Sequence, residues 1–175
     1  PDMMLYAGYP IARDSWRRKL RRDANGNSGW KNLKGLLLAL RSERARPIAL
    51  RILAWQAVLF VGLGVAFGWW VYPVMWLLPW MTVWRVLNRL RAVAEHGGLE
   101  ASSDRRVTTH HVRQSVTARF WMVPFNTGWH LAHHVDIGVP FSRLPRLQEE
   151  LERSGYVQPG LEWPTYRSLW RHAAS

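Results

Sequence analysis

The sequence contains no cysteine. That absence excludes disulfide bonds, zinc–thiolate sites and iron–sulfur clusters, so any metal ion must be held by His, Asp or Glu. Acidic residues are also scarce, with 12 Asp and Glu against 24 Lys and Arg. The resulting net charge of +12 favours an anionic partner, either nucleic acid or the surface of a membrane.

Charged residues are missing altogether from Ile52 to Trp84, a run of 33 residues. The run is too long for one globular core helix and long for one membrane span. Near its middle, Gly68 to Pro73 combine interfacial aromatic residues with a helix breaker. We therefore predict a hairpin of two membrane-spanning helices, roughly 48–68 and 71–90, the alternative being a buried helical pair of a large soluble protein.

Details of the run fit the hairpin interpretation. Two glycines, Gly62 and Gly64, allow close helix contact, and Pro79 is expected to kink the second span. Arg51 and Arg85 would reach the headgroups from the two open ends. Basic residues crowd both ends of the hairpin and are absent from its turn, which predicts that both chain termini are cytoplasmic.

The hairpin divides the chain into three predicted segments. Residues 1–46 form a basic cytosolic or interfacial segment, 47–90 the transmembrane hairpin, and 91–175 a cytosolic cap. The fold class we expect is an all-α membrane protein with a mostly helical cap. The 12 tryptophans suit a membrane interface, and because no nucleic-acid-binding motif accompanies the charge, nucleic acid is not an expected partner.

The N-terminal segment shows no signal-peptide pattern, since 1–9 has no basic stretch before an apolar core. A chain that begins with Pro1 is expected to be a processed product or a piece of a longer protein. The densest positive charge, from Arg17 to Arg22, is expected on interfacial helices. It would bind lipid headgroups or, as an alternative and together with Arg105 and Arg106, dock an acidic electron donor or the acidic face of an acyl carrier.

Two helices of the cap are predicted from their ends. A helix leaving the membrane from Arg85 should end at Gly97-Gly98, and an amphipathic helix over 144–153 should stop at Ser154-Gly155. Residues 107–122 are compatible with strand or helix, and 124–128 resemble a turn.

Three of the seven histidines lie in one short window, His130-Leu131-Ala132-His133-His134. In a helix these three imidazoles share one face and can bind a metal ion together. Iron that activates dioxygen and zinc that activates water both accept such ligands, and spacing alone leaves the two metals balanced.

The window and its surroundings resemble the third histidine box of membrane fatty acid desaturases. His130-Leu-Ala-His133-His134 is followed by Gly138-Val-Pro140-Phe141 and by Leu144-Pro145-Arg146-Leu147. Ala94-Glu95-His96-Gly97 is similar to the isolated histidine motif of bacterial members, and Asp2 to Arg13 to the segment after their second box. The resemblance covers nearly the whole chain.

The resemblance implies an oxidoreductase that uses dioxygen, electrons and two iron ions to introduce a double bond into a fatty-acyl chain. Such sites take about eight or nine histidines, and the matching positions here are His96, His130, His133 and His134. Candidates for hydrogen bonds that orient these imidazoles are Glu95, Asn126 and Asp136. The expected partners are the lipid bilayer of the inner or plasma membrane, the acyl substrate, and an electron donor of ferredoxin, rubredoxin or cytochrome b5 type.

The chain departs from the family pattern because no first or second histidine box precedes residue 130. We therefore expect the C-terminal portion of a longer enzyme, inactive alone and with an incomplete iron ligand set. His110, His111 and His172 are not expected to be ligands. The aromatic residues Trp121, Phe125 and Trp129 are expected either to line the substrate cavity or to anchor at the interface.

Two alternative functions remain open at this stage. One is a hydroxylase or ketolase of the same superfamily acting on an alkane, carotenoid or sphingoid substrate, since oxygen insertion and desaturation share an oxidant. The other is a non-catalytic, basic protein that binds membrane surfaces and holds no metal.

Overall fold

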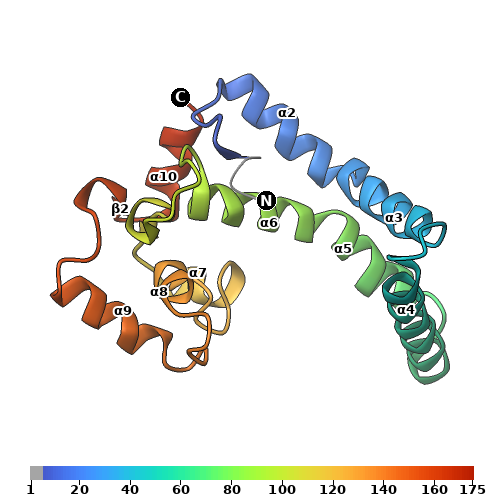
Figure 1. Ribbon diagram of the computed structural model, residues 1–175. Helices are drawn as coiled ribbons and strands as arrows, with labels where there is room; N and C mark the ends of the chain where they lie inside the picture. The colour runs from blue at the N-terminus through green and yellow to red at the C-terminus, as the bar shows by residue number, and fades with distance from the viewer. Residues whose placement is uncertain (1–5) are drawn as a thin grey trace. The chain divides into compact units, whose positions relative to one another are not determined.

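The computed structural model describes residues 6–175 and is mostly helical (Figure 1). In chain order its elements are α2 (Arg13–Ala24), α3 (Asn27–Ala39), α4 (Arg46–Phe67), the π-helix η1 (Tyr72–Leu77), α5 (Leu78–Met81), α6 (Val83–His96), the 3-10 helix η2 (Arg105–Val107), β1 (His111–Val112), α7 (Val116–Trp121), α8 (His130–Val135), α9 (Leu144–Arg153), the 3-10 helix η3 (Pro159–Leu161), β2 (Glu162–Trp163) and α10 (Tyr166–Ala173).

The chain divides into two compact units, with the boundaries falling inside α2 and α6. Unit 1 comprises Pro1–Trp16 and Asn88–Ser175, and unit 2 comprises Arg17–Leu87. The residues before the predicted hairpin thus form α2, which runs from unit 1 into unit 2, and α3, which lies within unit 2. The prediction that these helices are interfacial stays a prediction.

Helix α4 is the element of unit 2 that can cross a membrane. It is 22 residues long, which at about 1.5 Å per residue matches the hydrocarbon core of a bilayer. It is also the one helix in the described part of the chain with sufficient length and apolar character. Only 11% of its most apolar window is buried, whereas the core helix of a soluble protein would be largely covered.

The second predicted span is divided into η1, α5 and α6, so a two-span hairpin remains a prediction. Pro73 and Pro79 lie in the first turns of η1 and α5, where a missing N–H is tolerated. The helical path breaks at Thr82, whose φ is −118° and ψ is −82°. Arg85, which we expected at the open end, stacks its guanidinium 4.2 Å from the centre of the Trp80 ring.

Two contacts join α4 to the segment that follows it. Gln56, a polar residue within the apolar helix, accepts hydrogen bonds from the Tyr72 hydroxyl at 2.8 Å and the Trp76 indole N–H at 3.0 Å. Gly64 makes room for the Trp69 ring, since an added Cβ would lie 2.1 Å from a ring carbon. Of the two predicted contact glycines, Gly62 has nothing within 4 Å of such a Cβ.

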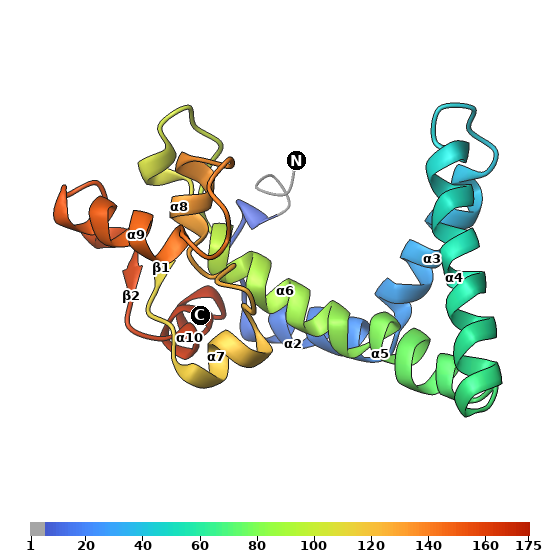
Figure 2. The ribbon, with the colours of Figure 1, turned by 90° about the horizontal axis from the view of Figure 1, so that it is seen from below.

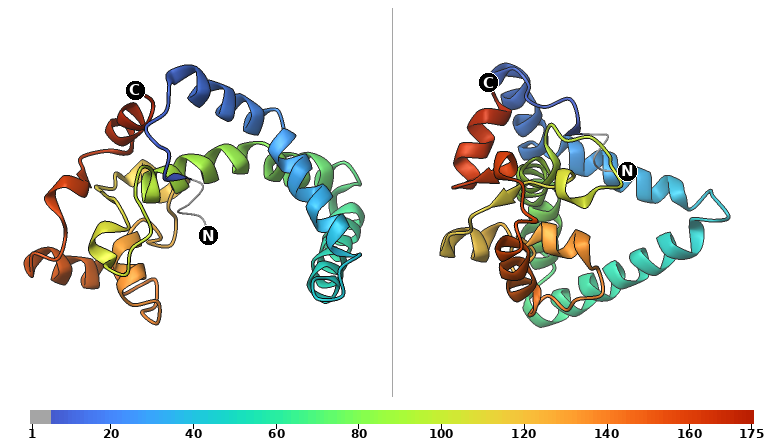
Figure 3. Two further views of the ribbon diagram at one scale, coloured as in Figure 1. Left: turned by 45° about the horizontal axis from the view of Figure 1, so that its top comes forward. Right: turned by 60° about the vertical axis from the view of Figure 1, so that its left-hand side comes forward.

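Unit 1 contains two apolar clusters. The first gathers Val93 and Ala94 of α6, Val112 of β1 and Leu169 of α10. Here β1 and β2 pair in parallel over two residues, an exception to the predicted all-α class (Figure 2). The second cluster packs α8 against α9 through residues such as Leu131 and Leu144 (Figure 3).

Local sequence signals account for several boundaries. Helix α6 ends at Gly97-Gly98, with Gly98 at a φ of +79°, and α9 covers Leu144–Arg153, so both predicted helices are confirmed. Residues 107–122, compatible with strand or helix, contain both β1 and α7. Ser115 caps α7 by accepting a hydrogen bond from the Ala118 amide at 3.2 Å.

Candidate metal centre

His96 ends α6 with its imidazole in a fixed orientation. Its Nδ1 lies 2.9 Å from the backbone carbonyl oxygen of Thr108, in the turn after η2. A carbonyl oxygen only accepts, so Nδ1 carries the proton and Nε2 keeps its lone pair. This side chain is buried, with 7% of its surface exposed.

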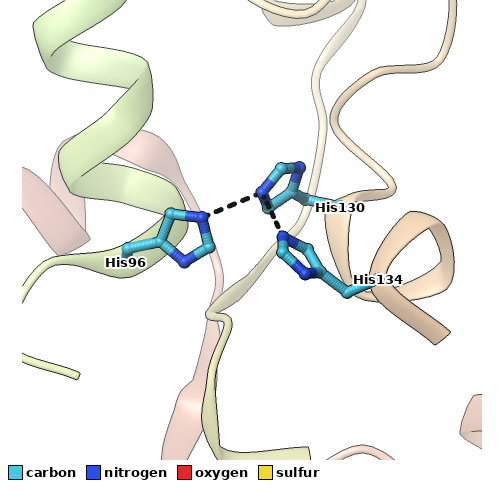
Figure 4. Close-up of side chains that lie close together, drawn as sticks. All are labelled: His96, His130 and His134. Carbon is cyan, nitrogen blue, oxygen red and sulfur yellow. Dashed lines mark hydrogen bonds between the residues drawn. The ribbon is translucent and has the colours of Figure 1, made fainter. Parts of the chain in front are cut away.

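Helix α8 brings two further imidazoles to that lone pair. His130 and His134 are four residues apart and so share one helix face, as predicted. The Nε2 atom of His130 lies 3.1 Å from Nε2 of His96 and 3.0 Å from Nε2 of His134. Figure 4 shows the three rings converging, His96 from α6 and the other two from α8.

The spacing of these nitrogen atoms fits a bound metal ion. All three ligand atoms lie within 4.8 Å of one another. Metal–nitrogen bonds of about 2.1 Å place neighbouring ligand nitrogens roughly 3.0 to 3.4 Å apart, as observed for both His130 pairs. Since Nε2 of His96 has no proton, an ion among the three would give each lone pair an acceptor. The donor set is therefore suited to iron or zinc.

Burial keeps the imidazoles of His130 and His134 neutral, which is the form that binds metal. Burial, helped by the neighbouring His134 and His96, lowers the pKa of His130 to about 2. Burial, helped by the neighbouring His96 and His133, lowers the pKa of His134 to about 4. At neutral pH no proton has to leave before these nitrogens coordinate an ion.

One carboxylate lies beside the cluster. Glu95 Oε2 is 3.6 Å from Nε2 of His130, while Oε1 accepts a 2.5 Å hydrogen bond from Arg91 Nε. Burial raises the pKa of Glu95, against the opposing attraction of Arg91. Glu95 was predicted to orient an imidazole through a hydrogen bond. Its carboxylate lies near Nε2 of His130, the same nitrogen that faces His96 and His134.

The other sequence-predicted residues lie outside the three-histidine cluster. His133 is exposed, and its ring centre is 6.1 Å from that of His130. Asn126 donates through Nδ2 to the Phe141 carbonyl, and Asp136 accepts from the Gly138 amide. Their roles as ligand or orienting group stay predictions.

The neighbouring pair His110-His111 has structural partners on both ring nitrogens of each residue. His110 Nε2 donates to the Gly97 carbonyl at 2.8 Å, and its Nδ1 accepts from the Trp163 indole at 3.1 Å. His111 lies 3.1 Å from Glu152 Oε1 through Nε2 and 3.2 Å from Gln148 through Nδ1. These contacts leave neither ring a nitrogen without a partner, and the expectation that the pair does not bind metal stays a prediction.

Sequence analysis missed Thr108 because its contribution is a main-chain carbonyl, which no side-chain motif reveals. The surroundings of Trp129 also went unpredicted. Its ring stacks on His111 with the centres 5.9 Å apart, and the Arg119 guanidinium lies 5.9 Å from its centre. Two other predicted cavity aromatics, Trp121 and Phe125, are exposed.

A comparison with protein families gives one match, to the model described as fatty acid desaturase, over residues 1–171. The match covers nearly the whole chain. No curated protein and no solved structure matches the sequence.

Proposed function

The chain belongs to the fatty acid desaturase family, and from this membership we propose that it supplies one part of a membrane-bound, dioxygen-dependent di-iron enzyme. The reaction is the introduction of a double bond into a fatty-acyl chain. His96, His130 and His134 hold one iron ion, and His133 is a ligand of the second. The histidines gathered here are fewer than the eight or nine that the family's two-iron site implies.

The observation that carries this proposal is the convergence of three Nε2 atoms from α6 and α8. Bound iron would supply the activation of dioxygen, a reaction that amino-acid side chains alone do not carry out. The residues of this chain prepare the ligands. The Thr108 carbonyl fixes the tautomer of His96, burial keeps His130 and His134 neutral, and Arg91 holds the Glu95 carboxylate at the cluster edge.

The membrane and the electron supply complete the proposal. Helix α4 anchors the chain in the inner or plasma membrane, with the histidine cluster on the cytoplasmic side by the distribution of basic residues. Electrons come from a ferredoxin, rubredoxin or cytochrome b5 type donor. The arginine-rich part of α2 binds headgroups, with donor docking as the alternative.

Two other functions are candidates, one that uses the same metal chemistry and one that is not catalytic. A hydroxylase or ketolase of the superfamily would use the same cluster, and the family match favours the desaturase. A non-catalytic basic membrane protein is the third candidate, but it gives no reason for three imidazole nitrogens to face one another.

Metal binding tests the proposal directly. The chain, purified in detergent, is titrated with Co²⁺ or Fe²⁺, and the Co²⁺ absorption bands and bound iron per chain are measured. We expect His130→Ala to weaken binding at least about 100-fold, because one of three ligands is lost. His172→Ala, an exposed histidine elsewhere in unit 1, is the matched control. Equal binding by both variants would refute the metal site.

Product analysis separates the candidate reactions. In cells that express the complete enzyme, mass spectrometry of acyl chains should show a loss of two hydrogens that disappears with His130→Ala. A gain of one oxygen would establish the hydroxylase instead.

A further inference from the structure

Helix α7 presents apolar side chains that unit 1 does not cover. The exposed fractions are 86% for Val116, 70% for Phe120 and 66% for Trp121. Contiguous apolar residues of this size on a protein surface usually mark a site of contact with a partner or a membrane. Trp and Phe are typical of helices that lie at the membrane interface.

A pocket of about 560 Å³ adjoins this helix, with walls from α7 and α10, which lie close together in Figure 2. Trp121 belongs both to the exposed edge and to the pocket wall. Two arginines, Arg113 and Arg167, line the pocket, and none of its described lining residues is acidic. Neither guanidinium forms an ion pair within residues 6–175, so both are available to an anion.

A further polar residue lines the pocket, and its side-chain amide has no hydrogen-bond partner. Gln114 lines the pocket, and its amide oxygen and nitrogen are both buried without a hydrogen-bond partner. The side chain is held tightly, since a Cβ added to Gly128 would lie 2.6 Å from its Cδ. Both amide atoms are closed off from solvent, so Gln114 shapes this wall and the polar contacts to a ligand come from the two arginines.

We propose that the pocket and the exposed edge of α7 together bind an anionic phospholipid of the bilayer. The phosphate lies between Arg113 and Arg167, and the acyl chains lie against Val116, Phe120 and Trp121. Trp121 belongs to both the cationic pocket and the apolar edge, so the two surfaces adjoin. A ligand with an anionic headgroup and apolar chains can therefore contact both. A free phosphate would leave the apolar edge uncovered. The site is separate from the histidine cluster, so its test does not depend on metal chemistry.

The absence of native cysteine makes the test clean, since a single introduced cysteine carries the only label. The full chain with Val116→Cys or Phe120→Cys is spin-labelled and placed in nanodiscs of phosphatidylcholine, with or without phosphatidylglycerol. The accessibility of the label to oxygen and to a water-soluble nickel complex is then measured. Arg146→Cys, on the exposed surface of α9, is the matched control label.

The expected result is that labels at 116 and 120 become oxygen-accessible and nickel-protected when phosphatidylglycerol is present, while the label at 146 stays in water. The double substitution Arg113→Gln and Arg167→Gln should reduce the phosphatidylglycerol effect at least about fivefold, but Arg171→Gln should not, since Arg171 lies on α10 outside the pocket wall.

Each alternative outcome counts against the proposal. Labels that stay in water in both lipid mixtures would overturn it, as would burial that ignores phosphatidylglycerol or the two arginines. The far-ultraviolet circular dichroism spectrum of each variant is recorded in parallel, because an unchanged spectrum shows that the helices are folded. A loss of lipid binding with an unchanged spectrum is therefore a loss of this site and not of the fold, whether or not the histidine cluster binds metal.

Discussion

Units 1 and 2 differ in where they put their apolar side chains. Unit 1 has a buried apolar core, in which Val93 is fully covered and Leu169 only 2% exposed, although the edge of α7 lies outside this core. Unit 2 turns them outward, and Val65 and Trp55 of α4 are 76% and 63% exposed. The first arrangement is stabilised by removing apolar surface from water, whereas the second is suited to lipid, in which helix contacts rest on packing and paired polar groups. The exposed apolar surface of unit 2 therefore suits a lipid environment, whereas unit 1 has an apolar core of its own.

Truncating a core residue of unit 1 should have the largest effect on folding. Leu169→Ala removes a side chain that is only 2% exposed from the first apolar cluster and should lower the free energy of unfolding by about 2 to 5 kcal/mol. Thermal unfolding in detergent, followed by circular dichroism, measures the change. The control, Leu38→Ala at a position 47% exposed in unit 2, should change stability by less than about 1 kcal/mol. Equal effects would remove the distinction between the units.

A charge introduced on α4 should show whether this helix of unit 2 prefers lipid to water. Val58 is 58% exposed near the middle of the helix, and Val58→Asp should make membrane insertion less favourable by about 3 kcal/mol. Val107→Asp, at a position 41% exposed in unit 1, should leave insertion unchanged. A glycosylation-based insertion assay compares the two. If Val58→Asp inserts as well as the unsubstituted chain, α4 does not cross the membrane.

Acid should weaken unit 1 selectively through its buried imidazoles. The folded-state pKa of His130 is lowered to about 2, below the value near 6.5 of an unfolded chain, so the unfolded state binds the proton first. Stability is complete above pH 6.5 and is lost as pH falls from there toward the folded pKa. Between pH 7.5 and 5.5 we expect a loss of about 1.4 kcal/mol from His130 in the metal-free chain.

Denaturant unfolding at the two pH values measures this loss. In His130→Asn the pH dependence should shrink, whereas His133→Asn, which replaces an exposed imidazole, should retain it. A pH dependence that is the same in both variants would mean that His130 is not held neutral by burial.

The smallest expected effect concerns the polar contacts inside unit 2. Gln56→Leu leaves the Tyr72 hydroxyl and the Trp76 N–H without their acceptor, at a cost of about 0.6 to 1.7 kcal/mol in a membrane. Tyr72→Phe removes one of the two hydrogen bonds and should have roughly half the effect. Steric trapping or unfolding in mixed micelles resolves differences of this size. Stabilisation by Gln56→Leu would show that α4 and η1 do not pair in lipid.

Sequence analysis succeeded where the signal is local. Glycines fix the end of α6, periodicity fixes α9, and the spacing of His130 and His134 places both imidazoles on one face of α8. It could not locate β1 and β2, because strands of two residues show no alternation and depend on a partner 51 positions away in register, His111 opposite Glu162. The division of the second span depends on how Pro79 and Thr82 are accommodated, which composition does not specify.

The candidate site likewise has parts that the sequence predicts and parts that only the folded chain shows. His96 was linked to the cluster by its resemblance to a family motif, since 34 residues separate it from His130 and no periodicity connects them. The partners that occupy both nitrogens of His110 come from Gly97 and Trp163, which are distant in sequence. Long-range contacts of this kind require the folded chain.

The hydrogen bond between His96 and the Thr108 carbonyl has a consequence for any mutational survey of this protein. The acceptor is a backbone atom, so a replacement that preserves the turn leaves it in place. The Thr108 side chain acts indirectly, since it is 1% exposed and its hydroxyl donates to the Arg105 carbonyl at 3.0 Å within the same turn. Nitrogen-15 spectra of the metal-free chain should find the His96 proton on Nδ1 in Thr108→Ser as in the unsubstituted chain, because serine keeps both the hydroxyl and the carbonyl.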